Sequence, residues 1–201
     1  MSKNRKEALL QAAKELFAQY GYAETTFKKI ADRAGVALGL LTHHYGNKEK
    51  LFLASGLDVL RNFEVCLTEA VAQAPTGYAG VMRFCEAYLN FSLDENSNWL
   101  VLVRCSPYSD MKTGADRDLM DLRFSNIHEI LVTQLEAGVA DGSLHCADPH
   151  VTAQVIISLM VGVNRTRVLT PYATHGLYDA ALAFVARAIA LEDRKVSPSS
   201  D

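Results

Sequence analysis

The residues with the clearest capacity for chemistry lie between positions 25 and 51, and they are suited to binding rather than to catalysis. Hydroxyl, imidazole and ammonium donors recur there among apolar and small residues. Such donors bind phosphate oxygens, whereas side chains on an exposed helix face read base edges. The candidates for phosphate contact or attraction are Thr26, Lys28, Lys29, Thr42, His44 and Lys48. The candidates for base contact are Leu38, Gly39, Leu40, Thr42 and His43.

Two short helices joined by a glycine turn are needed to position these side chains. The apolar residues of the first helix follow the spacing i, i+3, i+4 and i+7, which places them on one face: Phe27, Ile30, Ala31 and Ala34. Gly35 supplies the left-handed backbone of a tight turn. Val36 and Leu41 return to the same core. The pattern predicts a helix-turn-helix whose second helix is free to enter a DNA major groove.

The exposed face of that second helix has little hydrogen-bonding capacity beyond His43 and Thr42. Leu38 and Leu40 can pack on thymine methyl groups, and Gly39 lets the backbone approach closely. We therefore expect sequence readout to depend on methyl contacts and on DNA shape.

Composition and charge support a DNA partner for the N-terminal part only. The chain has 201 residues, 49% of them hydrophobic and 21% charged, as in an ordinary globular protein. Residues 1–50 carry nine Lys and Arg against five Asp and Glu, whereas the rest carries eleven against eighteen. No Ser/His/Asp, Cys/His or paired-carboxylate constellation and no glycine-rich phosphate loop stands out. We expect a DNA-binding protein rather than an enzyme, with a helical interaction scaffold as the alternative.

The N-terminus lacks the apolar stretch of a signal peptide. The most apolar run, 151–163, is interrupted by polar residues and is too short to span a bilayer. We therefore expect a cytoplasmic protein with no membrane partner.

The metal-ligating residue types do not combine into a convincing site. The four cysteines, Cys66, Cys85, Cys105 and Cys146, form no Cys-x-x-Cys pair and are interpreted as structural thiols. The segment 145–150 holds two histidines, a cysteine and Asp148, but Asp148 followed by Pro149 is typical of a helix start. We expect no metal and no cofactor, and keep a metal- or redox-responsive protein as an alternative.

The periodicity predicts an all-α chain of about nine helices. Their expected ranges are 4–20, two short helices within 25–45, then 48–73, 78–93, 99–105, 116–140, 149–169 and 176–192. Thr25, Asn47 and Asp148 are the expected N-caps, and Gly21 the stop of the first helix. The last two helices are apolar over more than one stripe, which predicts a homodimer built on them. Residues 196–201 are expected to be disordered.

The first fifty residues resemble the TetR family of transcriptional regulators. The matching residues are Ala12, Ala13, Leu16, Phe17, Gly21, Tyr22, Thr25, Thr26, Ile30, Ala31, Ala34, Gly35, Val36, Gly39, Leu41, His44, Tyr45, Lys48, Glu49 and Leu51. The resemblance implies a DNA-binding domain over 1–47, a helical effector-binding and dimerisation domain over 48–195, and a tail over 196–201. It also implies a dimeric repressor that a small molecule releases from a near-palindromic operator. Two positions depart from the family: Ala37 replaces a capping serine, and Thr42 replaces an aromatic residue.

The resemblance implies an effector pocket in the C-terminal helices. The candidate lining residues are Tyr88, Phe91, Trp99, Arg104, Tyr108, Phe124, His128, Met160, Asn164 and Arg165. Arg104 lies inside an apolar run and needs an acidic partner or an anionic ligand. We therefore expect an amphipathic effector with an apolar body and a polar or acidic end.

Overall fold

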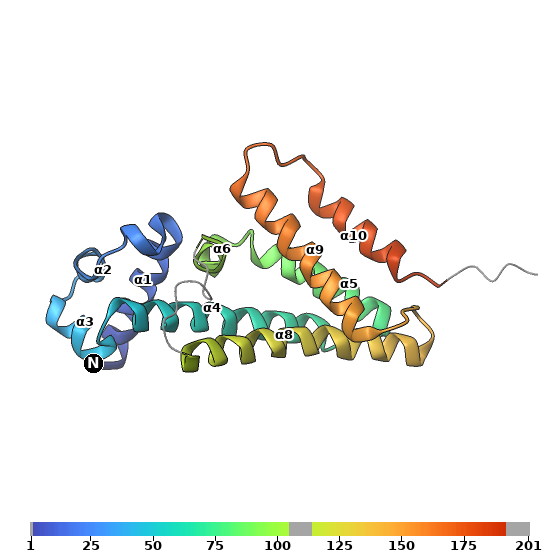
Figure 1. Ribbon diagram of the computed structural model, residues 1–201, viewed down its shortest axis with the longest axis horizontal. Helices are drawn as coiled ribbons and strands as arrows, with labels where there is room; N and C mark the ends of the chain where they lie inside the picture. The colour runs from blue at the N-terminus through green and yellow to red at the C-terminus, as the bar shows by residue number, and fades with distance from the viewer. Residues whose placement is uncertain (1, 105–113, 192–201) are drawn as a thin grey trace, which may run out of the picture. The chain divides into compact units, whose positions relative to one another are not determined.

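The computed structural model describes the backbone of residues 2–104 and 114–191, and the side chains of 5–103 and 117–191. These residues form nine α-helices and one short 3-10 helix, without a strand, which confirms the all-α prediction. The helices, shown in Figure 1, are α1 (Ser2–Glu24), α2 (Phe27–Ala34), α3 (Leu38–Tyr45), α4 (Lys48–Val71), α5 (Gly77–Phe91), η1 (Glu95–Ser97), α6 (Leu100–Arg104), α8 (Gly114–Asp141), α9 (Pro149–Leu169) and α10 (Leu177–Ala188). Tyr108, Cys105 and the predicted tail at 196–201 lie outside the described residues.

The chain divides into two compact units. Unit 1 consists of Met1–Leu67 and Tyr88–Ile127, and unit 2 of Thr68–Ala87 and His128–Asp201. Helices α4, α5 and α8 therefore each contribute to both units. The domain boundaries expected at 47 and 195 remain a prediction. Within the described part of the chain, the helices all fall short of the length or apolarity that a bilayer crossing demands.

Helix α1 is interrupted by Gly21, whose φ of 76° and ψ of 176° break the helical backbone as predicted. The apolar face before the break is buried at Leu9, Ala13 and Phe17. Tyr20 follows Phe17 at the same helical spacing, but it is 49% exposed. Its ring instead lies 5.6 Å from the Lys29 ammonium, a separation at which a cation and an aromatic face attract.

The prediction that Thr25 caps α2 is wrong by one residue. Thr26 is the N-cap: its backbone is extended, and its hydroxyl oxygen accepts the Lys29 N–H at 3.2 Å. Thr25 is fully buried, and its hydroxyl lies 2.8 Å from the carbonyl oxygen of Gly21 and 3.1 Å from that of Leu16. The single hydroxyl proton of Thr25 can be donated to one or the other of these carbonyls, so Thr25 bonds back to α1 while Thr26 caps α2.

The turn between α2 and α3 is built on Gly35, which adopts the left-handed conformation with φ 66° and ψ 34°. Its N–H donates to the carbonyl oxygens that end α2. Ile30, Ala31 and Leu41 are buried on the two sides of the turn. Helix α2 packs on both α1 and α3, so the helix-turn-helix predicted from the spacing is confirmed.

In unit 2, the end of α8 caps the start of α5. The Asp141 carboxylate accepts the Gly77 N–H at 2.8 Å, and the Ser143 hydroxyl oxygen accepts the Tyr78 N–H at 3.0 Å. The first N–H groups of a helix have no partner within it, so these bonds satisfy donors that would otherwise be lost. Gly138 faces Gly77 across this junction, which lets the two helix backbones approach closely.

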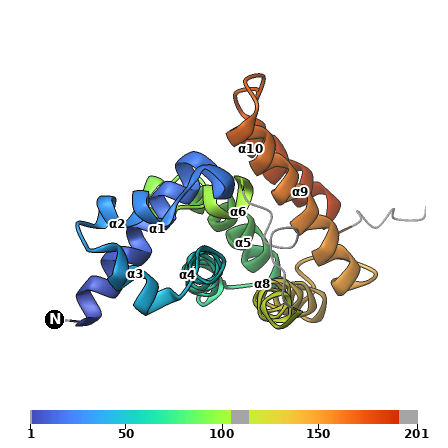
Figure 2. The same cartoon turned by 60° about the vertical axis from the view of Figure 1, so that its left-hand side comes forward.

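The start of α9 follows the prediction. Asp148 accepts the Val151 N–H at 3.0 Å, and Pro149 occupies the first turn. Helices α9 and α10 pack against each other and lie side by side in both Figure 1 and Figure 2. The His145 N–H donates to the Ile189 carbonyl oxygen at 3.0 Å, tying the loop before α9 to the end of α10.

The Asp141 cap predicts a pH-dependent contribution to stability. Hydrogen bonds from the Ser143 side chain and the Gly77 N–H hold the pKa of Asp141 below its ordinary value. The unfolded chain therefore takes up this proton first, and stability is lost as the pH falls from the ordinary aspartate pKa of about 3.9 through the lower folded value. We expect the difference in urea midpoint between wild type and Asp141→Asn to shrink from about pH 7 to about pH 3. Asp118→Asn, at an exposed aspartate of the same helix, is the control, and a difference independent of pH would contradict the prediction.

Candidate nucleic-acid interface

Helix α3 presents one face to solvent and the other to the core. Leu41 is fully buried and Tyr45 nearly so, with the Tyr45 hydroxyl donating to the Lys6 carbonyl oxygen at 3.1 Å. The opposite face carries the predicted base-reading residues. Leu38, Gly39, Thr42 and His43 are exposed, whereas Leu40 and His44 are half-buried. Leu38 is 48% exposed at the first position of the helix, where an apolar side chain gains only part of its possible burial free energy.

The start of α3 has no side-chain cap. Ala37 holds the extended N-cap conformation, with φ −67° and ψ 140°, but makes no capping hydrogen bond. The backbone therefore has the N-cap conformation, but alanine offers no capping oxygen. This agrees with the prediction from Ala37, which stands where the family usually has serine.

Ala37→Ser is expected to raise the free energy of unfolding by about 1 kcal/mol, because the new hydroxyl oxygen can accept a backbone N–H in the first turn of α3. Urea denaturation measures the gain. Ala37→Val is the matched control: it keeps a side chain at this exposed position but offers no acceptor. An equal gain in both variants would contradict the capping explanation.

The threonine donors differ in how freely they can reach a phosphate. The Thr26 hydroxyl oxygen accepts the Lys29 N–H, which leaves its own proton available for donation. The Thr42 hydroxyl donates to the Leu38 carbonyl oxygen at 3.4 Å, a long and therefore weak bond. Both side chains are exposed. Thr26 is the better prepared donor, and Thr42 must give up its bond within the helix.

The lysines around the helix-turn-helix are held to different degrees. Lys28 is exposed on α2, whereas the Lys29 ammonium donates to the Glu24 carbonyl oxygen at 2.8 Å. Lys48 donates to the Tyr22 carbonyl oxygen at 3.0 Å and lies 4.2 Å from the centre of the Tyr22 ring. An ammonium has three donors, so Lys29 and Lys48 keep donors for a phosphate while their side chains are held in place.

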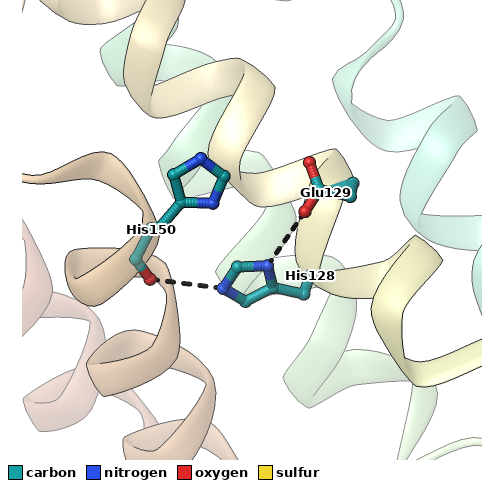
Figure 3. A group of neighbouring side chains, drawn as sticks. All are labelled: His128, Glu129 and His150. Atoms are coloured by element: carbon teal, nitrogen blue, oxygen red, sulfur yellow. Dashed lines mark hydrogen bonds and ion pairs between the residues drawn. The ribbon is translucent and has the colours of Figure 1, made fainter. Parts of the chain in front are cut away.

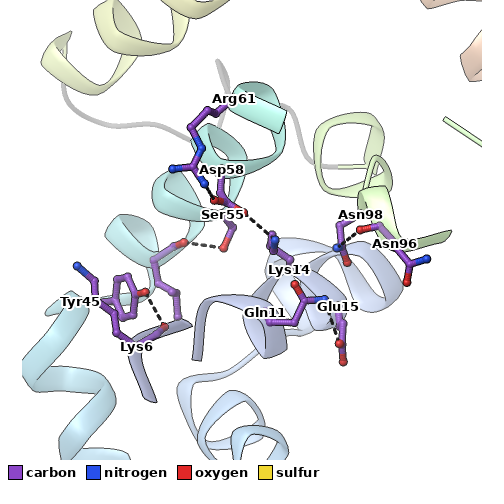
Figure 4. Close-up of polar contacts among 11 residues, drawn as sticks. Lys6, Gln11, Lys14, Glu15, Tyr45, Ser55, Asp58, Arg61, Asn96 and Asn98 are labelled. Atoms are coloured by element: carbon purple, nitrogen blue, oxygen red, sulfur yellow. Dashed lines mark hydrogen bonds and ion pairs between the residues drawn. The ribbon is translucent and has the colours of Figure 1, made fainter. Parts of the chain in front are cut away.

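A buried ion pair in unit 1 joins α1 to α4, and the sequence alone did not reveal it. The Lys14 ammonium lies 2.7 Å from the Asp58 carboxylate, and the two side chains are only 10% and 14% exposed (Figure 4). Arg61 binds the other carboxylate oxygen at 2.6 Å from an exposed position. Because the partners are 44 residues apart, no local spacing marks the pair. It fixes α1, which supports α2, on α4.

The aromatic candidates for the effector site pack on one another in unit 1. The ring centroids of Tyr88, Phe91 and Trp99 lie 4.9, 5.0 and 4.8 Å from that of Phe63 on α4. Tyr88 is buried, and burial raises the pKa of its hydroxyl far above the ordinary value. The structure therefore brings three of the candidates together around Phe63. The fourth aromatic candidate in this unit, Phe124, is half-buried.

The other described candidates belong to unit 2. Met160 and Asn164 are buried on α9, whereas Arg165 is exposed, so water can solvate its charge. His128 contacts the start of α9. The Arg104 side chain and Tyr108 lie outside the described residues. The assignment of these residues to an effector site stays a prediction.

The environments of Cys85 and Cys146 do not favour reactive thiolates. Burial raises the pKa of Cys85 to about 12 and also raises that of the half-buried Cys146. A thiol reacts through its thiolate, so a raised pKa lowers reactivity near neutral pH.

A family model described as bacterial regulatory proteins, tetR family, matches residues 9–55. A transcriptional regulator of Bacillus subtilis, YhgD, is 26% identical over 163 residues, covering 81% of this chain and 84% of that protein. The repressor KstR2 of Mycolicibacterium smegmatis is 29% identical over 142 residues, covering 70% of this chain and 67% of that protein.

Solved structures agree on the fold. A regulatory protein of the tetR family from Rhodococcus RHA1 aligns with a TM-score of 0.77 at 21% identity, covering 94% of this chain and 98% of that one. A transcriptional regulator from Saccharomonospora viridis in complex with choline has a TM-score of 0.82 at 15% identity, covering 95% of this chain and 100% of that one.

The fold, the exposed α3 face and these relatives define a helix-turn-helix transcriptional regulator rather than an enzyme. Residues 9–55 match the DNA-binding module of the tetR family, and over most of its length the chain is similar to transcriptional regulators. The family match over residues 9–55, which include α2 and α3, supports a DNA-binding function for these two helices.

Proposed function

We propose that this protein is a homodimeric repressor that leaves a near-palindromic operator when a small amphipathic effector binds. The observation that carries the proposal is the exposed face of α3, with Leu38, Gly39, Thr42 and His43 at its surface. The donors Thr26 before α2, Lys28 and Lys29 on α2, Thr42 on α3 and Lys48 on α4 would contact phosphates, while α3 enters the major groove. Leu38 and Leu40 would read thymine methyl groups.

An apolar stripe on α10 supports the dimer. Ala180, Ala183, Phe184, Ala188 and Leu191 are all exposed, and their spacing places them on one side of the helix and its C-terminal extension. Phe184 and Leu191 are each 56% exposed. Such a contiguous apolar surface marks an interaction site.

Helix α9 carries a second exposed stripe of apolar and small residues. Val151 and Val155 are 58% and 59% exposed, one helical turn apart, and the small residues Ser158 and Gly162 follow at the same spacing. A second copy would cover both stripes in a four-helix bundle and would present two recognition helices to two half-sites.

The effector would act through contacts within unit 1. Helix α6 packs against α1, and α1 is tied to α4 by the Lys14–Asp58 pair. A ligand that prefers one arrangement of these helices shifts the population toward it and moves α3 away from its half-site. The effector is proposed to have an apolar body and a polar or acidic end, with Arg104 as its partner. Titration of Arg104→Ala with small acids tests this, because unchanged affinity would exclude Arg104.

A salt titration tests the DNA-binding part of the proposal. Duplexes are selected from a random library, and binding is measured by fluorescence anisotropy at increasing salt. We expect an inverted repeat and a steep loss of affinity with salt, with the slope reduced by about one in Lys28→Ala. Arg83→Ala, an exposed arginine on α5, should leave the slope unchanged. Salt-independent or absent binding would instead favour an interaction scaffold.

Substitution on α10 tests the dimer. Phe184→Asp should convert the dimer to a monomer in analytical ultracentrifugation and weaken operator binding, because a charge would have to be buried in the interface. Leu122→Asp is the matched control, since Leu122 is 58% exposed on α8 and belongs to unit 1. A Phe184→Asp protein that sediments as wild type would exclude this interface.

A further inference from the structure

Two histidines and a glutamate meet where α8 approaches the first turn of α9 in unit 2 (Figure 3). The His128 Nδ1 lies 3.4 Å from a Glu129 carboxylate oxygen, and its Nε2 lies 3.2 Å from the His150 carbonyl oxygen. The rings of His128 and His150 stack with centroids 5.9 Å apart. Each of the three residues offers one ligand atom, and these atoms lie within 4.8 Å of one another.

The His150 carbonyl determines which nitrogen of His128 can bind an ion. A carbonyl oxygen only accepts, so the His128 Nε2 must carry the proton and donate it. In the neutral ring the lone pair is then on Nδ1, which faces the Glu129 carboxylate. Two acceptors that face each other at this distance are stabilised by a proton or a cation between them. Histidines that bind metals are commonly oriented in this way, with the second ring nitrogen donating to a backbone carbonyl.

We propose that His128, Glu129 and His150 bind a divalent transition-metal ion of the zinc class. Two imidazoles and one carboxylate are ligands that zinc prefers, whereas Mg²⁺ and Ca²⁺ prefer oxygen ligands alone. With zinc–ligand bonds of about 2.0–2.2 Å, two ligands on one ion lie at most roughly 4.4 Å apart. Small rotations therefore close the site, and Glu129 is free to make them because its side chain is 61% exposed. Water would complete the coordination from the solvent side.

This site differs from the one that the sequence motif at 145–150 suggested. Asp148 is engaged as the N-cap of α9, and burial raises the pKa of Cys146. His150 instead joins His128, which is 22 residues away. Bound metal would cross-link α8 to the first turn of α9. The inference does not depend on the proposed repressor function, because it concerns ion binding alone.

Isothermal titration of the full-length, tag-free protein with ZnCl₂ tests the site. We expect saturable binding of one ion per chain, and His128→Ala and His150→Ala should each weaken it at least about tenfold. His145→Ala and Cys146→Ser are the matched controls and should bind as wild type. No saturable binding below about 100 μM zinc, or equal binding by wild type and both histidine variants, would overturn the proposal.

A second variant and a second readout distinguish loss of the zinc ligands from misfolding of the variant. Glu129→Gln removes the charge at an exposed position, so its fold should be intact by circular dichroism while zinc affinity falls. Zinc should also raise the melting temperature of wild type but not of Glu129→Gln. With Co²⁺ as the probe, a thiolate charge-transfer band would assign the ion to a cysteine and overturn the proposal.

Discussion

Replacing Gly77 with alanine is expected to lower the free energy of unfolding by about 3 kcal/mol or more, because two backbones meet at this glycine. A Cβ atom at Gly77 would collide with the backbone N and Cα of Gly138, and would lie 2.5 Å from the Gln134 carbonyl oxygen. Backbone atoms cannot rotate away as a side chain can, so α5 and α8 would have to move apart. Urea denaturation of the full-length protein measures the loss.

The same movement would disturb the cap of α5. The Gly77 N–H donates to Asp141, so separating the helices also leaves this donor unpaired. Gly56→Ala is the matched control within α4. There the nearest atoms to a new Cβ are side-chain carbons of Met120 and Leu102 at 3.7 and 3.8 Å, an ordinary contact. Alanine in a helix interior is favoured over glycine by about 1 kcal/mol, so this variant should be at least as stable as wild type. Similar midpoints for the two variants would contradict the close-approach explanation.

Asp58→Ala is expected to cost about 2–4 kcal/mol in unfolding free energy, because it leaves the Lys14 ammonium largely buried without its carboxylate. The pair is 2.7 Å apart, and neither side chain is more than 14% exposed. Loss of the pair loosens α1 on α4, so operator affinity should fall together with stability. Chemical denaturation and anisotropy measure the two effects on the same preparation.

Arg61→Ala separates burial from charge in this cluster. Arg61 also binds Asp58, but its side chain is 63% exposed, and an exposed ion pair contributes less than about 1 kcal/mol. The double variant Lys14→Met with Asp58→Leu should recover much of the stability lost in Asp58→Ala, because no charge remains buried. If Arg61→Ala were as destabilising as Asp58→Ala, the loss in Asp58→Ala could not be attributed to burial of the Lys14–Asp58 pair.

Local features were predicted well where the physical cause is also local. Gly35 adopts the expected left-handed conformation at the end of α2, where a residue without a Cβ is favoured. Asp148 caps α9 as expected, because its carboxylate accepts an N–H only three residues ahead. Thr25 and Thr26 were confused, since adjacent threonines have the same capping chemistry. The break at Gly21, together with the packing around it, decided that Thr25 is buried and Thr26 is the cap.

The sequence by itself determined the helix-turn-helix, the all-α class and the apolar character of the last two helices, because periodicity and caps depend on neighbours a few residues away. Only the tertiary structure decided which distant residues meet. Lys14 with Asp58, Gly77 with Gly138, and His128 with His150 each come from different helices. The local sequence around each residue does not indicate these partners, since the contacts arise from how helices pack and not from spacing along one helix.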